Sequence, residues 1–457
     1  MKLLSSSSTK AGCGGKPPRA AAVLGLVALA WAWAGMPAQA QTQAQTQADT
    51  PAPVRITVTA SSLAGVYTLR AAVADALARS PAVAAAGSER VTAGYLREGA
   101  EWARYPTLSA EVVPGRSSSQ SGSNSRLLRL DQPLWSGGRI SGAIDLARAQ
   151  EAAARLGESE ARRNTEEQTA VAYLGWSGAQ ERLRIADDGR AVFERLLAYV
   201  ERREQAGAAA KSDVSAAQAR LASVGVQREQ LAAELERSRS ELRALVVGPV
   251  AGAPQALEVP ASALRDADSA EAEYLARSNV AAQREADIEA AQAAAAVRRG
   301  ESLPRLSLRL ERQDGTAGGV PGDTRAMLAL SFTPEAGLGS LSSIQAAQSR
   351  ITTAQDQARV AEQEIRLRAR AHLTEEQSAR RQIAGLVPQI ESLQYTADSY
   401  MRQFEAGRRT WIEVLNIFRE VLDTRVALSR ARTQHAQGAL RLMGNTGALS
   451  PWIETNP

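Results

Sequence analysis

The sequence contains little cysteine, histidine or aromatic side chain, and each shortage narrows the possible functions. Its single cysteine, Cys13, leaves the chain without an intramolecular disulfide. The two histidines, His372 and His435, stand apart in no metal-binding spacing, so we expect them to face solvent or to pack at helix contacts. Neither a phosphate-binding loop nor a nucleophile motif occurs. The sequence therefore predicts a protein that is not an enzyme, with no catalytic residue, cofactor or metal site.

Long apolar runs are also missing, except in the first 40 residues, which have the pattern of a signal peptide. An apolar stretch of 16 residues, 20–35, follows four basic residues and precedes an A-x-A cleavage site at 38–40. A membrane anchor is the alternative, which the shortness of this stretch disfavours. Cys13 precedes the stretch and cannot become a lipid-bearing N-terminal cysteine. We therefore expect an exported chain without a spanning helix.

The sequence also lacks a large excess of positive or negative charge. The formal net charge of +5 includes the four basic residues of the signal peptide, so it falls to +1 in the remaining chain. A nucleic-acid partner therefore has no electrostatic support. The composition instead favours long helices, because only 4% of the residues are aromatic while alanine, arginine, glutamate and leucine are abundant.

Two blocks of more than 100 residues, 137–247 and 336–443, carry a helical period that is broken only near Gly207 and Gly407. Apolar residues step by three and four toward the second glycine: Ile383, Leu386, Ile390, Leu393, Ala397, Tyr400 and Phe404. Gly407 can end that helix, and a capping box of Thr410 with a glutamate three residues later can start the next one. Each block is predicted to be a long helical hairpin with a glycine turn at its tip.

Four short segments alternate apolar and polar residues, as half-exposed strands do: 105–113, 125–134, 303–312 and 325–333. In the third, Leu306, Leu308 and Leu310 share one face, while Ser307 and Arg309 share the other. Polar loops join the segments in two pairs. The sequence therefore predicts two β-hairpins, each with one apolar face.

The chain is an internal duplication. Residues 77–80 recur as 275–278, and residues 106–109 recur as 304–307. Each repeat has the order helix, strand, loop, strand, long helix, tip and returning helix. The predicted organisation is a signal peptide at 1–40, a flexible leader at 41–68, a first repeat at 69–248, a linker at 249–268, a second repeat at 269–445 and a tail at 446–457.

Strands with one apolar face fit a membrane barrel, because only helices and closed barrels satisfy their backbone groups in lipid. Four strands cannot close a barrel, for which about eight is the practical minimum. We therefore expect several copies of the chain to share one barrel in outer-membrane lipid. The alternative is a soluble hairpin patch on a coiled-coil scaffold.

Two short motifs stand out: residues 130–139 are L-D-Q-P-L-W-S-G-G-R, and residues 407–416 are G-R-R-T-W-I-E-V-L-N. They resemble two motifs of the TolC family of outer-membrane efflux proteins, the Q-P-L-[FW]-x-G-G-R start of the first long helix and the G-x-R-T-x-x-D-V-L-[ND] tip. The duplication is also typical of the family, and the resemblance covers about residues 69–445. It implies a mainly α fold with a transmembrane β-barrel part: a homotrimer whose twelve-stranded barrel continues as a twelve-helix coiled-coil tunnel.

The resemblance further implies a bacterial outer-membrane location, with the tunnel in the periplasm. The implied partners at the helix tips are a periplasmic adaptor protein and an inner-membrane ATP-driven exporter or other pump.

Carried over residue by residue, the resemblance implies a gate at the tips. Arg409 matches a family arginine that bonds to an aspartate and a hydroxyl residue of the other hairpin, here Asp213 and Ser212. Phe404 replaces a family tyrosine of the same network and lacks its hydroxyl, so we expect a weaker or rearranged gate.

Glu413 and Asn416 match two constriction aspartates of the family, so a trimer would present one ring of three carboxylates instead of two. Helix capping is the alternative role of Asp213, Glu413 and Thr410.

Further residues mark the strand-to-helix junctions: Pro133, Trp135, Gly137, Gly138 and Pro334. Trp102, Tyr105 and Trp135 are expected either at the periplasmic membrane boundary or packed in the barrel throat.

The sequence thus predicts the exit duct of a tripartite export system. Within the family, the tip and residues 419–422 most resemble ducts for type I secretion of a large protein such as an adhesin or toxin. Drug efflux is the second interpretation. A periplasmic adaptor or scaffold without a pore is the alternative of another class, although the β domains of adaptors are not evident in the sequence.

Overall fold

The structure is a computed structural model that describes residues 66–114, 124–250, 252–255, 257–260, 264, 266–314, 323–333 and 339–455. All of these belong to one compact unit, residues 61–457. The predicted signal peptide, the predicted leader up to residue 65, and Pro334 lie outside the described residues.

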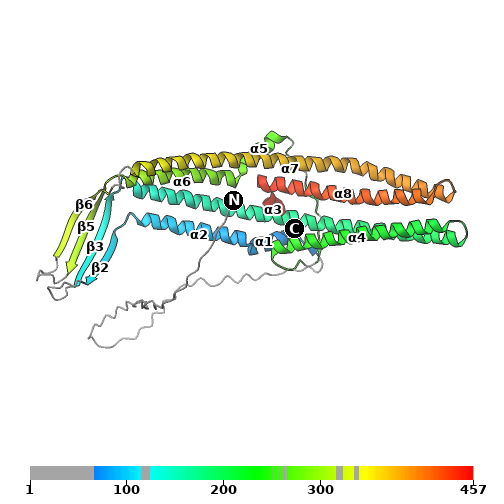
Figure 1. Ribbon diagram of the computed structural model, residues 1–457, viewed down its shortest axis with the longest axis horizontal. Helices are drawn as coiled ribbons and strands as arrows, with labels where there is room; N and C mark the ends of the chain where they lie inside the picture. Colours follow the sequence, from blue (N-terminus) through cyan, green and yellow to red (C-terminus); the bar gives the residue numbers. More distant parts are fainter. Residues whose placement is uncertain are drawn as a thin grey trace, which may run out of the picture. The chain divides into compact units, whose positions relative to one another are not determined.

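The described elements follow one another along the chain in this order: β1 (Val66–Tyr67), α1 (Leu69–Arg79), α2 (Pro81–Trp102), β2 (Thr107–Pro114), β3 (Asn124–Trp135), α3 (Arg139–Gln205), α4 (Lys211–Val246), β4 (Ala253–Pro254), α5 (Ala267–Arg277), α6 (Asn279–Glu301), β5 (Arg305–Asp314), β6 (Asp323–Ser331), α7 (Gly339–Glu405), α8 (Trp411–Thr446) and α9 (Leu449–Thr455). Figure 1 shows the four strands β2, β3, β5 and β6 side by side, beyond the ends of the helices.

The duplication is visible in the helix lengths. Helices α3 and α7 each contain 67 residues, and α4 and α8 each contain 36. At 1.5 Å per residue, α3 and α7 are each roughly 100 Å long. Such lengths suit a coiled-coil wall, since burying a globular core does not require them.

The four strands form one antiparallel sheet in the order β2-β3-β5-β6. Their register places Leu108, Leu130 and Leu310 in one row across three neighbouring strands. These side chains are 66%, 37% and 42% exposed. The sheet therefore presents an apolar face that the chain itself leaves uncovered, with β2 and β6 as its edges.

Helix packing continues the order of the strands. Next to the sheet, α3 contacts both α2 and α6, and α6 contacts α7, so α2 and α7 are the edge helices. Toward the tips, α3 packs on α4 and α8, and α8 packs on α7 (Figure 1). On α7, three alanines spaced seven residues apart are buried, which lets neighbouring helices approach closely: Ala347, Ala354 and Ala361.

Two main hydrophobic clusters hold the helices together. One joins α1 to the middle of α3 and the ends of α4 and α8, around Tyr173, Trp176 and Leu440. The other joins the two hairpins near their tips, around Phe193 and Trp411. Among the described helices, none combines the length and the hydropathy needed to cross a bilayer.

Sequence reasoning missed two features near the middle of the helices. Strand β1 pairs in parallel with β4, and the Tyr173 hydroxyl joins them by donating to the Tyr67 carbonyl over 2.6 Å and accepting from the Gln255 N–H over 2.8 Å. The predicted tail also contains helix α9, which buries Leu449 and Ile453. Both segments are too short to show a period.

Candidate functional site

The two hairpin tips share one backbone geometry. Gly207 has a φ of +70° and Gly407 a φ of +71°, in the left-handed region that glycine enters without steric cost. In both tips the N–H of the following residue bonds over 2.8 Å to a carbonyl five residues earlier. That bond closes the helix end and reverses the chain.

The second tip is capped by a complete network of side chains. The Thr410 hydroxyl accepts from the Glu413 N–H over 3.4 Å, and the Glu413 carboxylate accepts from the Thr410 N–H over 2.9 Å. Arg409 Nη1 lies 2.5 Å from Glu413, and its guanidinium lies 4.2 Å from the centre of the Tyr400 ring. The Thr410 N–H and hydroxyl, together with Arg409, lower the pKa of Glu413 to about 2. Glu413 therefore keeps its charge at any physiological pH.

The first tip has only half of this network. Its capping residue, Ala210, has no hydroxyl, and the Asp213 carboxylate accepts from the Ala210 N–H over 3.3 Å. Ser212 is exposed, and its side chain makes no hydrogen bond within the described ranges. No ion pair joins Asp213 to Arg409 in this part of the chain, where Arg409 binds within its own hairpin. In a single copy, both acids cap their own helices.

An aromatic cluster connects the tips, and sequence reasoning missed most of it. Phe404 is buried, and its ring centre lies 4.8 Å from that of Trp411 and 6.3 Å from that of Tyr199. Trp411 is only 2% exposed and stacks on Tyr199 at 6.2 Å. The Arg203 guanidinium covers the Phe404 ring at 5.1 Å. Phe404, whose missing hydroxyl suggested a weaker gate, is therefore an apolar contact between the two hairpins.

Polar pairs extend this connection along the hairpins. They join α4 to α8 at seven-residue intervals, with separations of 2.7, 3.1 and 3.8 Å, respectively: Arg220–Asn416, Gln227–Asp423 and Arg430–Glu234. Asn416, predicted as a neutral constriction residue, accepts the first of these bonds.

The strand-to-helix junction is formed by two consecutive glycines. The register shifts between Pro133 and Trp135, and then Gly137 and Gly138 have φ of +60° and +86°. A side chain at Gly137 would also meet Leu303 at 2.8 Å. This bend passes the chain from the sheet into α3 while α6 packs beside it.

The aromatic residues near this junction are largely exposed. Trp102, Tyr105 and Trp135 are 61%, 58% and 50% exposed, and the first two rings are 5.1 Å apart. A single copy of the described chain therefore leaves these three side chains uncovered.

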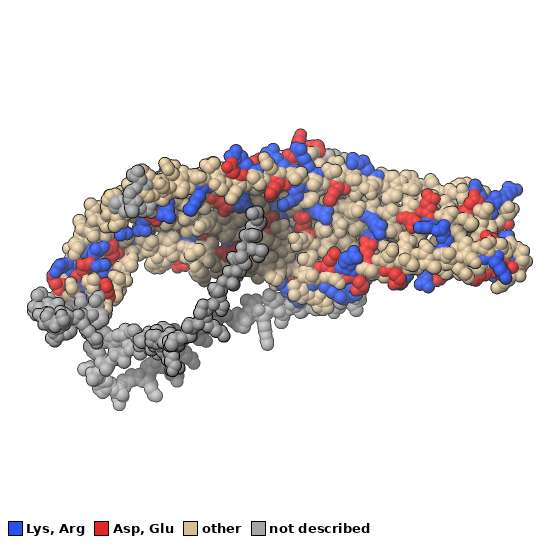
Figure 2. Space-filling model, in the orientation of Figure 1, with Lys and Arg blue, Asp and Glu red and all other residues tan. Residues whose placement is uncertain are grey.

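The face of the sheet opposite the exposed leucines carries paired charges, and Figure 2 shows acidic and basic side chains intermingled over the strands. Arg129 lies 2.8 Å from Glu311, and Arg309 lies 2.9 Å from Asp131. These residues alternate with the exposed leucines, so they occupy the opposite face. The sheet thus has one apolar face and one polar, charge-balanced face.

The histidines pack at helix contacts, the second of the two expectations. His372 Nδ1 lies 3.2 Å from the Tyr274 hydroxyl, and His435 Nε2 lies 3.0 Å from a carboxylate oxygen of Glu376, which is 1% exposed. Within the described ranges no three acidic, histidine or cysteine side chains gather in a metal-binding arrangement.

Known proteins match both the sequence and the fold. Residues 72–248 match the family model "outer membrane efflux protein". Among solved structures, the CusC chain shares 18% identity at a TM-score of 0.72, covering 83% of this chain and 91% of CusC. The outer-membrane channel OprN shares 22% identity at 0.72, covering 83% and 90%. The outer membrane protein VceC of Vibrio cholerae shares 17% identity at 0.71, covering 83% and 96%. No curated protein has a significantly similar sequence.

Residues 72–248 are thus similar to the outer membrane efflux proteins, and the described chain has the fold of CusC, OprN and VceC. The predicted family resemblance, fold class and outer-membrane location are confirmed. The proteins matched are channels rather than enzymes, as predicted.

Proposed function

We propose that the protein is the exit duct of a tripartite export system, formed by three copies of the chain. The observation that carries this proposal is the open sheet. It exposes a leucine face that suits lipid, and its edge strands β2 and β6 have no further partner among the described strands. Joining β6 of one copy to β2 of the next satisfies both edges, and three copies supply the twelve strands that the family resemblance implies.

The edge helices support the same assembly. On α2, Val91, Tyr95 and Leu96 are 45%, 70% and 60% exposed, and on α7, Val360 and Leu367 are 53% and 70% exposed. Exposed apolar rows on the two opposite edges of one helical layer suit a head-to-tail ring that closes on itself.

Two measurements test the duct. Light scattering of the detergent-solubilised protein should give a mass of about three chains, and insertion into a planar bilayer should give discrete conductance steps. A lone chain that stays soluble without detergent and produces no conductance would reject the duct in favour of the scaffold interpretation.

The gate belongs to this proposal. The aromatic cluster of Tyr199, Phe404 and Trp411 holds the two tips of one copy together, while the Glu413 carboxylates of the three copies form one ring in the assembly. An adaptor that separates the hairpins has to break the aromatic contacts. Ile412, 56% exposed at the tip, offers an apolar contact for such a partner.

For the cargo, we propose a large protein exported by type I secretion with an inner-membrane ATP-driven exporter. The support is the resemblance of residues 407–416 and 419–422. Small-molecule efflux is the second candidate, favoured by the family description. Deleting the gene separates them: loss of one large protein from the culture medium supports secretion, whereas increased antibiotic sensitivity with an unchanged medium supports efflux.

A further inference from the structure

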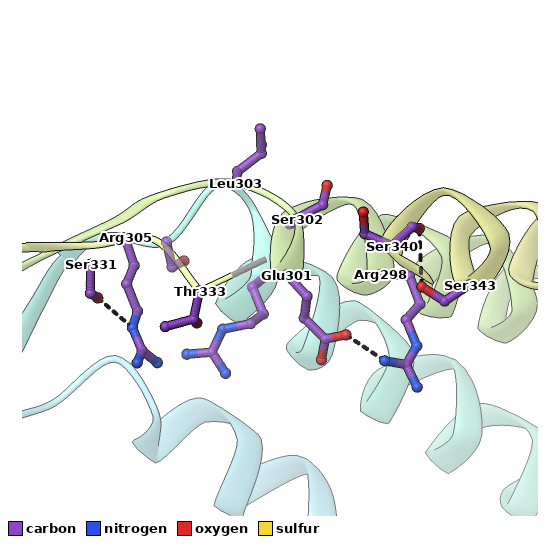
Figure 3. Close-up of a pocket in the computed structure, with 12 residues that line it drawn as sticks. Arg298, Glu301, Ser302, Leu303, Arg305, Ser331, Thr333, Ser340 and Ser343 are labelled. Carbon is purple, nitrogen blue, oxygen red and sulfur yellow. Dashed lines mark hydrogen bonds and ion pairs between the residues drawn. The ribbon is translucent and has the colours of Figure 1, made fainter. Parts of the chain in front are cut away.

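A cavity of about 380 Å³ lies where the sheet meets the long helices. The end of α6, the ends of β5 and β6 nearest the helices, and the starts of α3 and α7 surround it. Its lining contains three arginines, Arg139, Arg298 and Arg305, and one acid, Glu301, and most other lining residues carry hydroxyl groups. Figure 3 shows Arg305, Glu301 and Arg298 on the same side of the backbone, with Leu303 pointing away.

The arginines of this cavity are only partly neutralised. Arg298 Nη1 lies 2.7 Å from Glu301, which balances one charge. Arg305 donates through Nε to the Ser331 hydroxyl over 2.7 Å, and its terminal amines remain available. The Arg139 side chain has no hydrogen bond or ion pair among the described residues. Among the described residues, two guanidinium groups thus share a small polar space without a matching carboxylate.

The cavity opens on the polar face of the sheet. Arg305 and Ser331 alternate along β5 and β6 with Leu306 and Leu330, which lie on the exposed apolar face. In a membrane barrel the apolar face meets lipid and the polar face lines the interior. Arg305 therefore faces the lumen of the proposed duct.

Other arginines on the same face of the sheet are paired with carboxylates. Arg129 and Arg309 stand within 3 Å of a carboxylate and are neutralised, as is Arg325, whose Nε lies 2.7 Å from Asp323. Unbalanced positive charge on the described inner face is concentrated at the base of the sheet.

We propose that this cavity binds an anionic group, a phosphate or a carboxylate, carried by the solute that passes through the duct. Guanidinium forks and hydroxyl donors are the groups that bind such anions, and the volume fits an anionic group with part of its carrier. Repeated in each copy, the cavities form a positive band at the foot of the barrel, in contrast to the carboxylates of the tips. The transport role rests on the proposed function, whereas anion binding does not.

The first test is the binding of inorganic phosphate to the detergent-solubilised protein, measured by phosphorus NMR line broadening and repeated with acetate. Each lost arginine should weaken binding about tenfold, since one charge-assisted hydrogen bond contributes about that factor. The variants are Arg139→Gln and Arg139→Gln with Arg305→Gln. Arg325→Gln is the matched control, because it removes a neutralised arginine from the same face.

The second test is the reversal potential under a potassium chloride gradient in planar bilayers. The wild type should favour chloride, and the double variant should shift several-fold toward potassium. Arg325→Gln with Asp323→Asn, which removes a neutral pair from the same face, should stay near the wild type. Equal phosphate affinity in the wild type and both cavity variants would overturn the site. If the double variant does not assemble, the single variant takes its place, because the Arg139 side chain makes no hydrogen bond or ion pair among the described residues.

The experiments can reject the duct and the anion site independently of each other. Phosphate binding that is lost in the cavity variants, with no conductance from any protein, rejects the duct and keeps the site. Conductance without phosphate or acetate binding rejects the site and keeps the duct.

Discussion

The two hairpin tips have nearly identical backbones and different side chains. Their capping residues have the same φ of −86° and ψ of 152°, and corresponding residues are 200 positions apart. Yet Ala210 and Lys211 of the first tip correspond to Thr410 and Trp411 of the second. Helical period and one glycine are enough to set the backbone of a tip, so the remaining positions are free to diverge. The second tip has acquired the cap, the ion pair and the buried aromatics.

Removing Trp411 should have the largest effect on this asymmetry. Trp411→Ala opens a cavity beside Phe404 and should lower the free energy of unfolding by about 3–5 kcal/mol. Because the same contact joins the hairpins, single-channel conductance should rise as well. Lys211→Ala, at the corresponding exposed position of the first tip, is the control and should change neither quantity. Equal effects of both variants would show that the aromatic cluster does not hold the gate.

A second difference between the repeats lies in the middle of the long helices. Burial raises the pKa of Glu167 to about 7, despite the opposing charges of Arg441 and Arg368. The folded state therefore holds this proton where the unfolded chain releases it, and stability falls as the pH rises from about 4.5 to 7. Glu167→Gln should remove about 3 kcal/mol of this pH dependence, as measured by denaturant unfolding at pH 5 and pH 8.

The corresponding residue of the second repeat provides the control for Glu167. Leu367 is 70% exposed, so Leu367→Gln should leave the pH dependence of unfolding as it is in the wild type. An unchanged pH profile in Glu167→Gln would place the titrating group elsewhere.

Exchanging the capping residues tests whether the two tips have the same backbone geometry. Thr410→Ala should cost about 1 kcal/mol by removing the hydroxyl that accepts from the Glu413 N–H. Ala210→Thr should stabilise the first tip by a similar amount, because Asp213 already occupies the reciprocal position. Thermal unfolding of both variants and of the double exchange measures the two changes. A first tip that gains nothing would mean that its backbone differs from the second.

The smallest expected change in stability belongs to Arg409. Its ion pair with Glu413 is partly exposed, so Arg409→Ala should cost only about 0.2–1 kcal/mol. Conductance should nevertheless rise if Arg409 also bonds to a neighbouring copy at the gate. Arg408→Ala is the control, since Arg408 has no ion pair within the described ranges. Unchanged conductance in Arg409→Ala would show that Arg409 supports the helix cap and does not hold the gate.

Local patterns predicted the regular elements of this chain well. The strands lie within one or two residues of the predicted segments, because period-two alternation is a property of adjacent residues. The long helices begin and end near the predicted glycines and caps for the same reason. The fold class followed from these elements and the family motifs, and the structural matches confirm it.

Local sequence patterns could not predict the contacts between residues that lie far apart in the chain. Tyr199 and Trp411 belong to different repeats, and no sequence period places one beside the other. The polar pairs between α4 and α8 could have been suspected from their shared seven-residue spacing, but the spacing alone does not show which helices are neighbours. The short β1–β4 pair and α9 depend on packing against Tyr173 and other core residues.

The sequence by itself determined the repeats, the helix and strand boundaries and the apolar strand faces, because each depends on residues close together in the chain. Only the tertiary structure decided that Phe404 strengthens the contact between the hairpins and that Arg139 has no charge partner among the described residues. Both outcomes depend on which side chains from distant segments meet, and that is settled by the packing of the helices against one another.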